Sequence, residues 1–209
     1  MSIKHILAIG SAKGGVGKST ICANLAIGLS EKYRVGILDA DIYGPSQHLL
    51  FRLEDSKPEI INREGKKVLQ PLNALGVKIN SMGFIMGSEE AVIWRGPMLS
   101  NALKQLIEAT EWGDLDILIV DMPPGTGDSY LTIAKEIKPT ASILVTTNHV
   151  LSLSDTEKSK IALKILGFPI IGYINNMNGE LCPKCNSETI QQTNIGDKYL
   201  KDVTCIGSI

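Results

Sequence analysis

The chain has 209 residues, of which 44% are hydrophobic and 21% are charged, and its formal net charge is −1. This length and composition are enough to bury the core of one domain without disulfides or a structural metal. The small net charge argues against a dedicated nucleic-acid binder, and the aromatic content of 5% argues against a base-stacking platform. No apolar run approaches the ~18 residues that span a bilayer, and no signal peptide is recognisable. We therefore expect a cytoplasmic protein that binds neither nucleic acid nor a membrane.

Short apolar segments alternate with longer helical patterns along the chain. The predicted strands are residues 3–10, 34–39, 76–82, 115–121, 141–146 and 169–175. The predicted helices are residues 19–32, 97–111 and 152–166. Residues 51–74 are polar and predict an insertion or hairpin, and residues 179–195 predict an irregular loop. Continuous apolar strands separated by helices indicate a mostly parallel sheet with helices on both faces.

A glycine-rich loop follows the first predicted strand and precedes the first predicted helix. It reads Ser11-Ala12-Lys13-Gly14-Gly15-Val16-Gly17-Lys18-Ser19-Thr20. Glycines allow successive N–H groups to face one anion, and the helix adds its positive N-terminus. In this strand–loop–helix context the motif predicts that residues 12–20 bind ATP within a three-layer α/β P-loop NTPase fold. We expect Lys18 to contact the β- and γ-phosphates, Ser19 to ligate Mg²⁺ and Thr20 to reach the α-phosphate.

Acidic residues end two of the predicted strands. Asp39 and Asp41 end the second strand, where a carboxylate can orient the water that attacks the γ-phosphate or can simply cap a turn. Of the two, Asp39 is expected to be structural or to lie near Mg²⁺ without binding it directly. Asp121 ends an almost wholly apolar strand, the Walker B arrangement that holds Mg²⁺. The next segment, Pro123-Pro124-Gly125-Thr126-Gly127-Asp128, has the prolines and glycines of a nucleotide-dependent switch. Within it, Asp128 is predicted to cap a helix that begins at Ser129.

Two of the four cysteines, Cys182 and Cys185, form a C-x-x-C pair in a polar segment. Such a pair is a redox dithiol, half of a zinc site or half of an iron–sulfur site. A tetrahedral metal or a [4Fe-4S] cluster takes about four ligands, which two chains around a two-fold axis would provide. Cys205 is either a third ligand or a small core residue, and Cys22 is predicted to pack in the core.

The phosphate loop also departs from the ordinary pattern, which has glycine where Ala12 stands and lacks the additional lysine, Lys13. In both respects it resembles the deviant phosphate loops of the MinD, ParA and nitrogenase-iron-protein type. In that group the early lysine reaches across a dimer to the partner's nucleotide. The resemblance implies the same role for Lys13.

Over its whole length the chain resembles the Mrp/ApbC family of iron–sulfur cluster carrier ATPases, whose eukaryotic relatives include the Nbp and Ind types. Besides the phosphate loop and the cysteine pair, the resemblance rests on Asp39-Ala40-Asp41-Ile42-Tyr43-Gly44-Pro45-Ser46, Trp94-Arg95-Gly96-Pro97-Met98, Asp121-Met122-Pro123-Pro124-Gly125-Thr126-Gly127-Asp128 and Asn175-Asn176-Met177. It implies a homodimer that binds ATP, hydrolyses it slowly and holds a [4Fe-4S] cluster between two cysteine pairs. The cluster would pass to iron–sulfur apoproteins, and cluster assembly proteins would be further partners.

The resemblance also implies roles for individual residues. It makes Asp41 catalytic together with Lys13 and Lys18, and it lets Asn176 recognise adenine through its amide, which can both donate and accept. It implies a single P-loop NTPase domain over residues 1–209. Relatives continue with a loop and a final helix, so we expect the chain to be truncated at its C-terminal end relative to the family.

A positioning ATPase of the MinD or ParA kind is the alternative function. A MinD-like protein would carry a basic amphipathic C-terminal helix for membrane contact, whereas the segment 203–209 is strand-like. A ParA-like protein would bind DNA, which the net charge of −1 does not favour. Neither accounts for Cys182 and Cys185. An ATP-dependent ligase would need a substrate pocket that the sequence does not reveal.

Overall fold

The computed structural model describes residues 2–63, 65–84, 96–125, 130–131, 133, 136–185, 187–190 and 195–209. Residues 94–95 of the predicted Trp94–Met98 signature lie outside this part of the chain. So do Thr126 to Asp128 of the predicted switch, with the expected helix cap at Asp128 and the helix start at Ser129.

In the described part of the chain the main sheet has eight strands, in the order β12-β9-β8-β1-β7-β2-β6-β5. Their bounds are β1 Ile3–Gly10, β2 Val35–Asp39, β5 Leu72–Ala74, β6 Val77–Ser81, β7 Leu115–Asp121, β8 Ala141–Thr147, β9 Ile170–Asn176 and β12 Cys205–Ser208. Every pairing is parallel except that of β5 with β6. Each strand predicted from the sequence is present to within one residue at either end.

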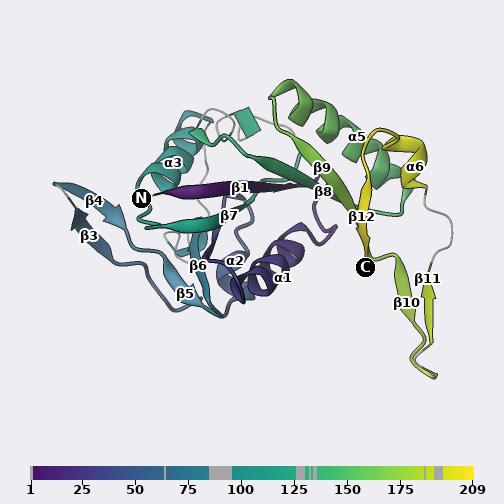
Figure 1. Cartoon of the computed structure of the whole chain (residues 1–209), viewed down its shortest axis with the longest axis horizontal. Coiled ribbons are helices and arrows are strands. Elements are labelled where there is room, and N and C mark those ends of the chain that lie inside the picture. The colour runs from purple at the N-terminus through teal and green to yellow at the C-terminus, as the bar shows by residue number, and fades with distance from the viewer. Residues whose placement is uncertain are drawn as a thin grey trace.

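Helices lie on both faces of this sheet, with α1 on one side and α3 and α5 on the other (Figure 1). The helices are α1 Lys18–Ser30, α2 Gln47–Leu50, α3 Gly96–Glu108, α5 Val150–Ile165 and α6 Gly196–Tyr199, with a 3₁₀ turn, η1, at Met82–Phe84. Neighbouring side chains of β7 pack into two hydrophobic cores, one on each face of the sheet, because side chains alternate across a strand. Leu118 packs in the core that contains Leu103 of α3, and Ile119 packs in the core that contains Cys22 of α1. The predicted three-layer α/β fold is therefore confirmed.

Two small antiparallel hairpins stand outside the main sheet. The first, β3 Ile60–Arg63 with β4 Lys66–Leu69, confirms the hairpin predicted within residues 51–74. The second, β10 Gly179–Leu181 with β11 Glu188–Ile190, occupies a segment for which an irregular loop was predicted. That prediction was wrong because each strand is only three residues long, too short for a two-residue alternation to be recognised.

The second hairpin projects away from the end of the sheet (Figure 1). Its base is fixed at Asn178, which lies between β9 and β10. The backbone N–H of Asn178 donates to the carbonyl of Ile209 at 2.7 Å, and its side-chain Nδ2 donates to Ser208 Oγ at 2.9 Å. The hairpin is thus attached to the edge strand β12 as well as to β9.

Candidate functional site

The predicted phosphate loop lies where β1 ends and α1 begins, beside the carboxyl ends of β2 and β7. It opens on a depression of about 260 Å³. The lining residues are Ser11, Lys13, Gly14, Gly15, Gly17, Lys18, Ser19, Thr20, Asp41, Gly44 and Pro124. The fold therefore brings most of the predicted nucleotide-binding residues together. Val16 is instead buried in the core beneath the loop, and Ala12 is half-buried.

Lys18 joins the loop to the acidic strand ends. Its Nζ forms a buried ion pair with the carboxylate of Asp121 and lies 3.3 Å from Ser19 Oγ and 3.9 Å from Asp41 Oδ2. Burial lowers the pKa of Lys18, but the charges of Asp121 and its other neighbours outweigh burial and raise the pKa above its usual value. Lys18 is therefore held as a cation among oxygen atoms, an arrangement suited to a phosphate charge.

Asp39 is fully buried and holds the backbone of the following loop. Its Oδ2 accepts from the N–H groups of Ser46 and Gln47 at 2.9 and 3.0 Å and from Ser81 Oγ at 2.8 Å. Its Oδ1 accepts from the N–H of Asp41 at 3.2 Å. Burial and the nearby Asp121 carboxylate raise the pKa of Asp39 to about 7. With its oxygens occupied by protein donors, Asp39 fixes the loop that carries Asp41.

Asp41 itself faces the depression. Its side chain is 12% exposed, and its Oδ1 accepts from the N–H of Gly44 at 3.3 Å. Burial raises the pKa of Asp41 more than the nearby Lys18 lowers it, so the net pKa lies above the ordinary value. On the other side of the depression, the N–H of Gly125 donates to the carbonyl of Ser11 at 3.1 Å, which ties the segment after β7 to the phosphate loop.

Sequence reasoning missed Gln47, the first residue of α2. The side chain is fully buried, and Nε2 donates to Asp121 Oδ2 at 2.7 Å and to the backbone carbonyl of Ser19 at 3.1 Å. No motif marks this glutamine, because its contacts come from β7 and α1, which are distant in the sequence. The hydrogen bond from its backbone to Asp39 is likewise visible only in the structure, so no signal in the sequence could have found it.

Asn176 ends β9 and meets the phosphate loop from the side. Its Nδ2 donates to the carbonyl of Val16 at 2.9 Å. Gly17 has a φ of 86°, and a Cβ at this position would lie 2.1 Å from Nδ2 of Asn176. Both the left-handed backbone and the close contact therefore require glycine at position 17.

We expect Gly17→Ala to destabilise the fold by about 1–3 kcal/mol through its backbone strain, with a further cost from displacing Asn176. Urea unfolding monitored by circular dichroism would measure the loss. Gly14→Ala is the matched control, because a Cβ there meets no atom within 4 Å. Equal stability of the two variants would contradict the constraint at Gly17.

The cysteine pair lies in the turn of the β10–β11 hairpin. Cys182 is partly buried, Cys185 is exposed, and both are free thiols. The N–H of Cys182 donates to the carbonyl of Ser187 at 3.0 Å, and Cys185 Sγ lies 3.0 Å from Ser187 Oγ. Hydrogen bonds from the Ser187 hydroxyl and backbone, with a further one from Cys182, lower the pKa of Cys185. A thiol whose thiolate is stabilised in this way suits metal ligation.

The other two cysteines lie elsewhere. Cys22 is fully buried in α1, where burial and the Asp121 charge raise the pKa of its thiol. Cys205 starts β12, partly buried, and its Sγ donates to the carbonyl of Gly207 at 3.4 Å. Among the described residues no group of three or more His, Cys, Asp or Glu side chains is placed to hold a metal ion.

We expect Ser187→Ala to slow the alkylation of Cys185 by iodoacetamide at neutral pH. Removing the hydroxyl raises the pKa of Cys185 toward its usual value, so less thiolate is present and the rate–pH profile moves to higher pH. Peptide mass spectrometry would measure the rate, with Cys205 in the same sample as the internal reference. An unchanged profile would show that Ser187 does not stabilise the thiolate.

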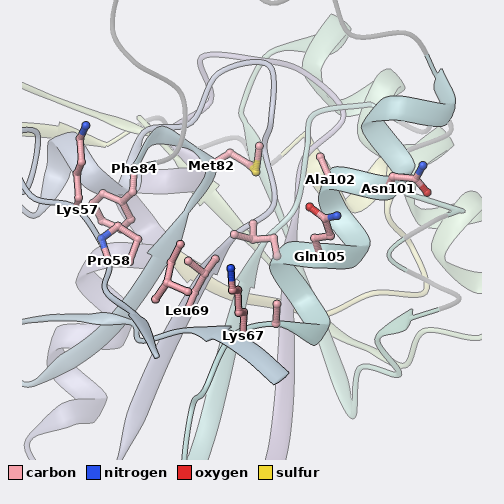
Figure 2. Close-up of a pocket in the computed structure, with 12 residues that line it drawn as sticks. Lys57, Pro58, Lys67, Leu69, Met82, Phe84, Asn101, Ala102 and Gln105 are labelled. Carbon is pink, nitrogen blue, oxygen red and sulfur yellow. The ribbon is translucent and has the colours of Figure 1, made fainter. Parts of the chain in front are cut away.

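A larger cavity, about 790 Å³, lies between the β3–β4 hairpin, η1 and α3. Figure 2 shows Leu69, Met82, Phe84 and Ala102 around it, with Lys67 extending from β4. Among the described residues, it shares no lining residue with the depression at the phosphate loop. None of the site residues predicted from the sequence lines this cavity.

The comparisons with known proteins agree with this geometry. Residues 2–207 match the family model described as NUBPL iron-transfer P-loop NTPase, of the ParA group. The chain belongs to this family. The predicted family resemblance and the P-loop NTPase fold are therefore confirmed.

Curated relatives carry names that refer to iron–sulfur clusters. The chain is 46% identical over 189 residues to the iron–sulfur cluster carrier protein of Helicobacter pylori, a match that covers 90% of this chain and 51% of the relative. It is 42% identical over 188 residues to the iron–sulfur cluster transfer protein NUBPL of Dictyostelium discoideum, covering 90% of this chain and 58% of the relative. The chain thus spans little more than half the length of these relatives.

Solved structures show the same fold. A nucleotide-binding protein of Archaeoglobus fulgidus, solved in complex with ADP, matches with a TM-score of 0.79 and 30% identity, covering 99% of this chain and 80% of that one. The septum site-determining protein MinD of Pyrococcus horikoshii, complexed with Mg-ADP, matches with a TM-score of 0.66 and 23% identity, covering 100% and 81%. The MinD likeness shows the fold alone. No helix in the described part of the chain is long and apolar enough to cross a membrane.

Proposed function

We propose that this chain is an ATP-hydrolysing iron–sulfur cluster carrier that binds a [4Fe-4S] cluster between two copies and transfers it to apoproteins. The observation that carries the proposal is a pair of free thiols, partly buried Cys182 and exposed Cys185, placed together on a projecting hairpin of a P-loop NTPase. The names of the curated relatives support it. We further propose that residues 1–209 form one domain and that its four thiols, all free, belong in a reducing cytoplasm.

For ATP binding we assign the phosphates to the backbone of residues 12–20 and to the Lys18 ammonium. Oxygen donors suit Mg²⁺, and the Ser19 hydroxyl and the Asp121 carboxylate, which both lie beside Lys18, provide them. Bound there, the metal would neutralise charge on the β- and γ-phosphates. Thr20, exposed at the start of α1, would reach the α-phosphate.

For hydrolysis we assign Asp41 to orient the attacking water. It faces the depression from the loop that Asp39 fixes, so its carboxylate is held near the position of a γ-phosphate beside Lys18. Lys13 is exposed at the mouth of the loop, where it is free to reach the nucleotide of a second copy. Asn176 uses one amide hydrogen on Val16, which leaves its second hydrogen and its Oδ1 for the adenine base.

For the cluster, the ligands we assign are Cys182 and Cys185 of each copy. One chain supplies two thiolates and a [4Fe-4S] cluster takes four, so a homodimer completes the site. An exposed hairpin places the cargo where an apoprotein or a cluster assembly protein can approach it. Cys22 is buried and far from this hairpin in the sequence, so it has no part in ligation.

Anaerobic reconstitution with iron and sulfide tests the proposal. The expected result is one [4Fe-4S] cluster per two chains, measured by iron analysis and Mössbauer spectroscopy, together with a dimer in analytical ultracentrifugation. Incubation with an apo-ferredoxin should then move the cluster to the acceptor. A complete cluster on a monomer would contradict the shared site, and a cluster that never leaves the protein would contradict the carrier role.

A further inference from the structure

The side chain of Gln47 lies buried against Asp121 and Ser19 of the nucleotide site and has no role in the function proposed above. It is 0% exposed, although glutamine is a residue that rarely lies fully buried. Both hydrogens of its amide are used, one on Asp121 Oδ2 and one on the carbonyl of Ser19. Gln47 therefore contacts both residues that we assign to Mg²⁺.

The backbone of the same residue belongs to the loop that carries Asp41. The N–H of Gln47 donates to Asp39 Oδ2, the oxygen that also accepts from Ser46 and Ser81. Between Asp39 and Gln47 the chain passes through Asp41, the proposed catalytic residue. One residue thus connects the end of β7 and the start of α1 to the loop after β2.

The remaining polar atom of Gln47 has no partner. Its Oε1 is buried and accepts no hydrogen bond from the described part of the chain. Leaving a buried carbonyl without a donor costs about 1–3 kcal/mol, so a donor that arrives with the ligand would recover this energy. Mg²⁺ usually keeps several of its water molecules in a nucleotide site, and these water molecules are hydrogen-bond donors.

We propose that Gln47 is a positioning residue that holds Asp121 for Mg²⁺ and makes the order of the Asp41 loop depend on the metal. The proposal rests on the nucleotide-binding part of the proposed function. The amide of Gln47 fixes the orientation of the Asp121 carboxylate, and its Oε1 accepts from the hydration shell of the metal. Because the backbone of Gln47 is bonded to Asp39, the metal then also stabilises residues 41–46.

Gln47→Met keeps the size of the side chain and removes both of its side-chain hydrogen bonds, while the backbone hydrogen bond to Asp39 is retained. We expect this variant to bind ADP normally in the presence of EDTA, but to lose about 10–100-fold in Mg²⁺ affinity, the usual effect of removing a partner of a metal ligand. Isothermal titration of the ADP complex with Mg²⁺ would measure it. A wild-type Mg²⁺ affinity, or an equal loss of ADP affinity without the metal, would overturn the proposal.

Two controls separate this role from a purely structural one. Ser81→Ala weakens the hold on Asp39 without touching Asp121, and it should lower the Mg²⁺ affinity far less than Gln47→Met does. Gln105→Met makes the same chemical change on α3, away from the site, and should leave the Mg²⁺ affinity unchanged. A loss of Mg²⁺ affinity in either variant equal to that of Gln47→Met would contradict a specific role.

Hydrogen exchange of the wild-type chain tests the same proposal and does not depend on whether a variant folds. Hydrogen exchange of the Ser46 and Gln47 amides should be slower with ADP and Mg²⁺ than with ADP alone, and equal exchange in the two states would overturn the proposal. None of these experiments uses iron or sulfide. A failed cluster reconstitution would therefore contradict the carrier function alone, and an unaltered Mg²⁺ affinity in Gln47→Met would contradict the role of Gln47 alone.

Discussion

Replacing Cys182 and Cys185 together by alanine is expected to abolish cluster binding and to leave nucleotide binding unchanged. Thiolate sulfur is the ligand that holds an iron–sulfur cluster, and alanine offers no replacement. The hairpin that carries the pair projects from the sheet (Figure 1), and none of its described residues lines the depression at the phosphate loop. Reconstituted protein should therefore lose its bound iron and the broad visible absorption of the cluster, while an ADP titration gives the wild-type affinity.

Cys205→Ala is the matched control for this experiment. Cys205 is partly buried in β12, and its thiol bonds the carbonyl of Gly207, so it has a structural contact of its own. It should retain the full iron content. Loss of the cluster in Cys205→Ala would instead support the three-thiolate site that the sequence left open. Retention of the cluster in the double variant would overturn the assignment of the hairpin.

Asp41→Ala should reduce ATP hydrolysis by about 10²–10⁴-fold, the range found when a group that handles the reacting water is removed, with little effect on ATP affinity. Asp41 contributes no backbone to the phosphate loop, so its loss leaves the phosphate-binding N–H groups in place. Lys18 Nζ lies 3.9 Å from Asp41 Oδ2 and is held more closely by Asp121, so Lys18 should keep its position in the variant. A single-turnover assay of phosphate release would measure the rate, and fluorescent ATP analogue titration would measure the affinity.

Lys18→Ala distinguishes binding from chemistry in the same pair of assays. It removes the buried cation of the site and leaves Asp121 and Asp41 without their neutralising partner, so nucleotide binding should be lost together with hydrolysis.

If Asp41→Ala hydrolyses ATP at the wild-type rate, the water-orienting role of this aspartate is wrong. If it fails to bind ATP, the effect belongs to the loop structure rather than to catalysis.

The features that could be predicted from the sequence are those whose cause is local. The strand Leu115–Asp121 is an almost wholly apolar run, and Gly15 and Gly17 take the positive φ values that the loop needs, so both features are visible without tertiary information. Asp39 was expected to be structural or close to the metal, and its hydrogen bonds show how it holds the loop. The catalytic and ligand roles of the site residues remain predictions.

The features that escaped prediction depend on contacts between distant segments. Gln47 owes its place to Asp121, 74 residues away, and a helix of four residues gives no hint of a buried amide. The β10–β11 hairpin is too short for a periodic pattern. For Asn176, the expected contact with adenine stays a prediction, and the structure shows a hydrogen bond to Val16 that only the packing of β9 beside the phosphate loop creates.

The hydrogen bond between Asn176 and Val16 links the proposed binding sites of the nucleotide and of the cluster through a short stretch of the chain. Val16 belongs to the loop that would cradle the phosphates, and its carbonyl is held by the side chain of Asn176 at 2.9 Å. Asn176 is the last residue of β9, and the cysteine-bearing hairpin begins at Gly179. If the loop and the hairpin bind a nucleotide and a cluster as we propose, a displacement of the phosphate loop on exchange of ATP for ADP would act on the base of the hairpin. The energy of the nucleotide would then have a mechanical route to the cluster within a single chain.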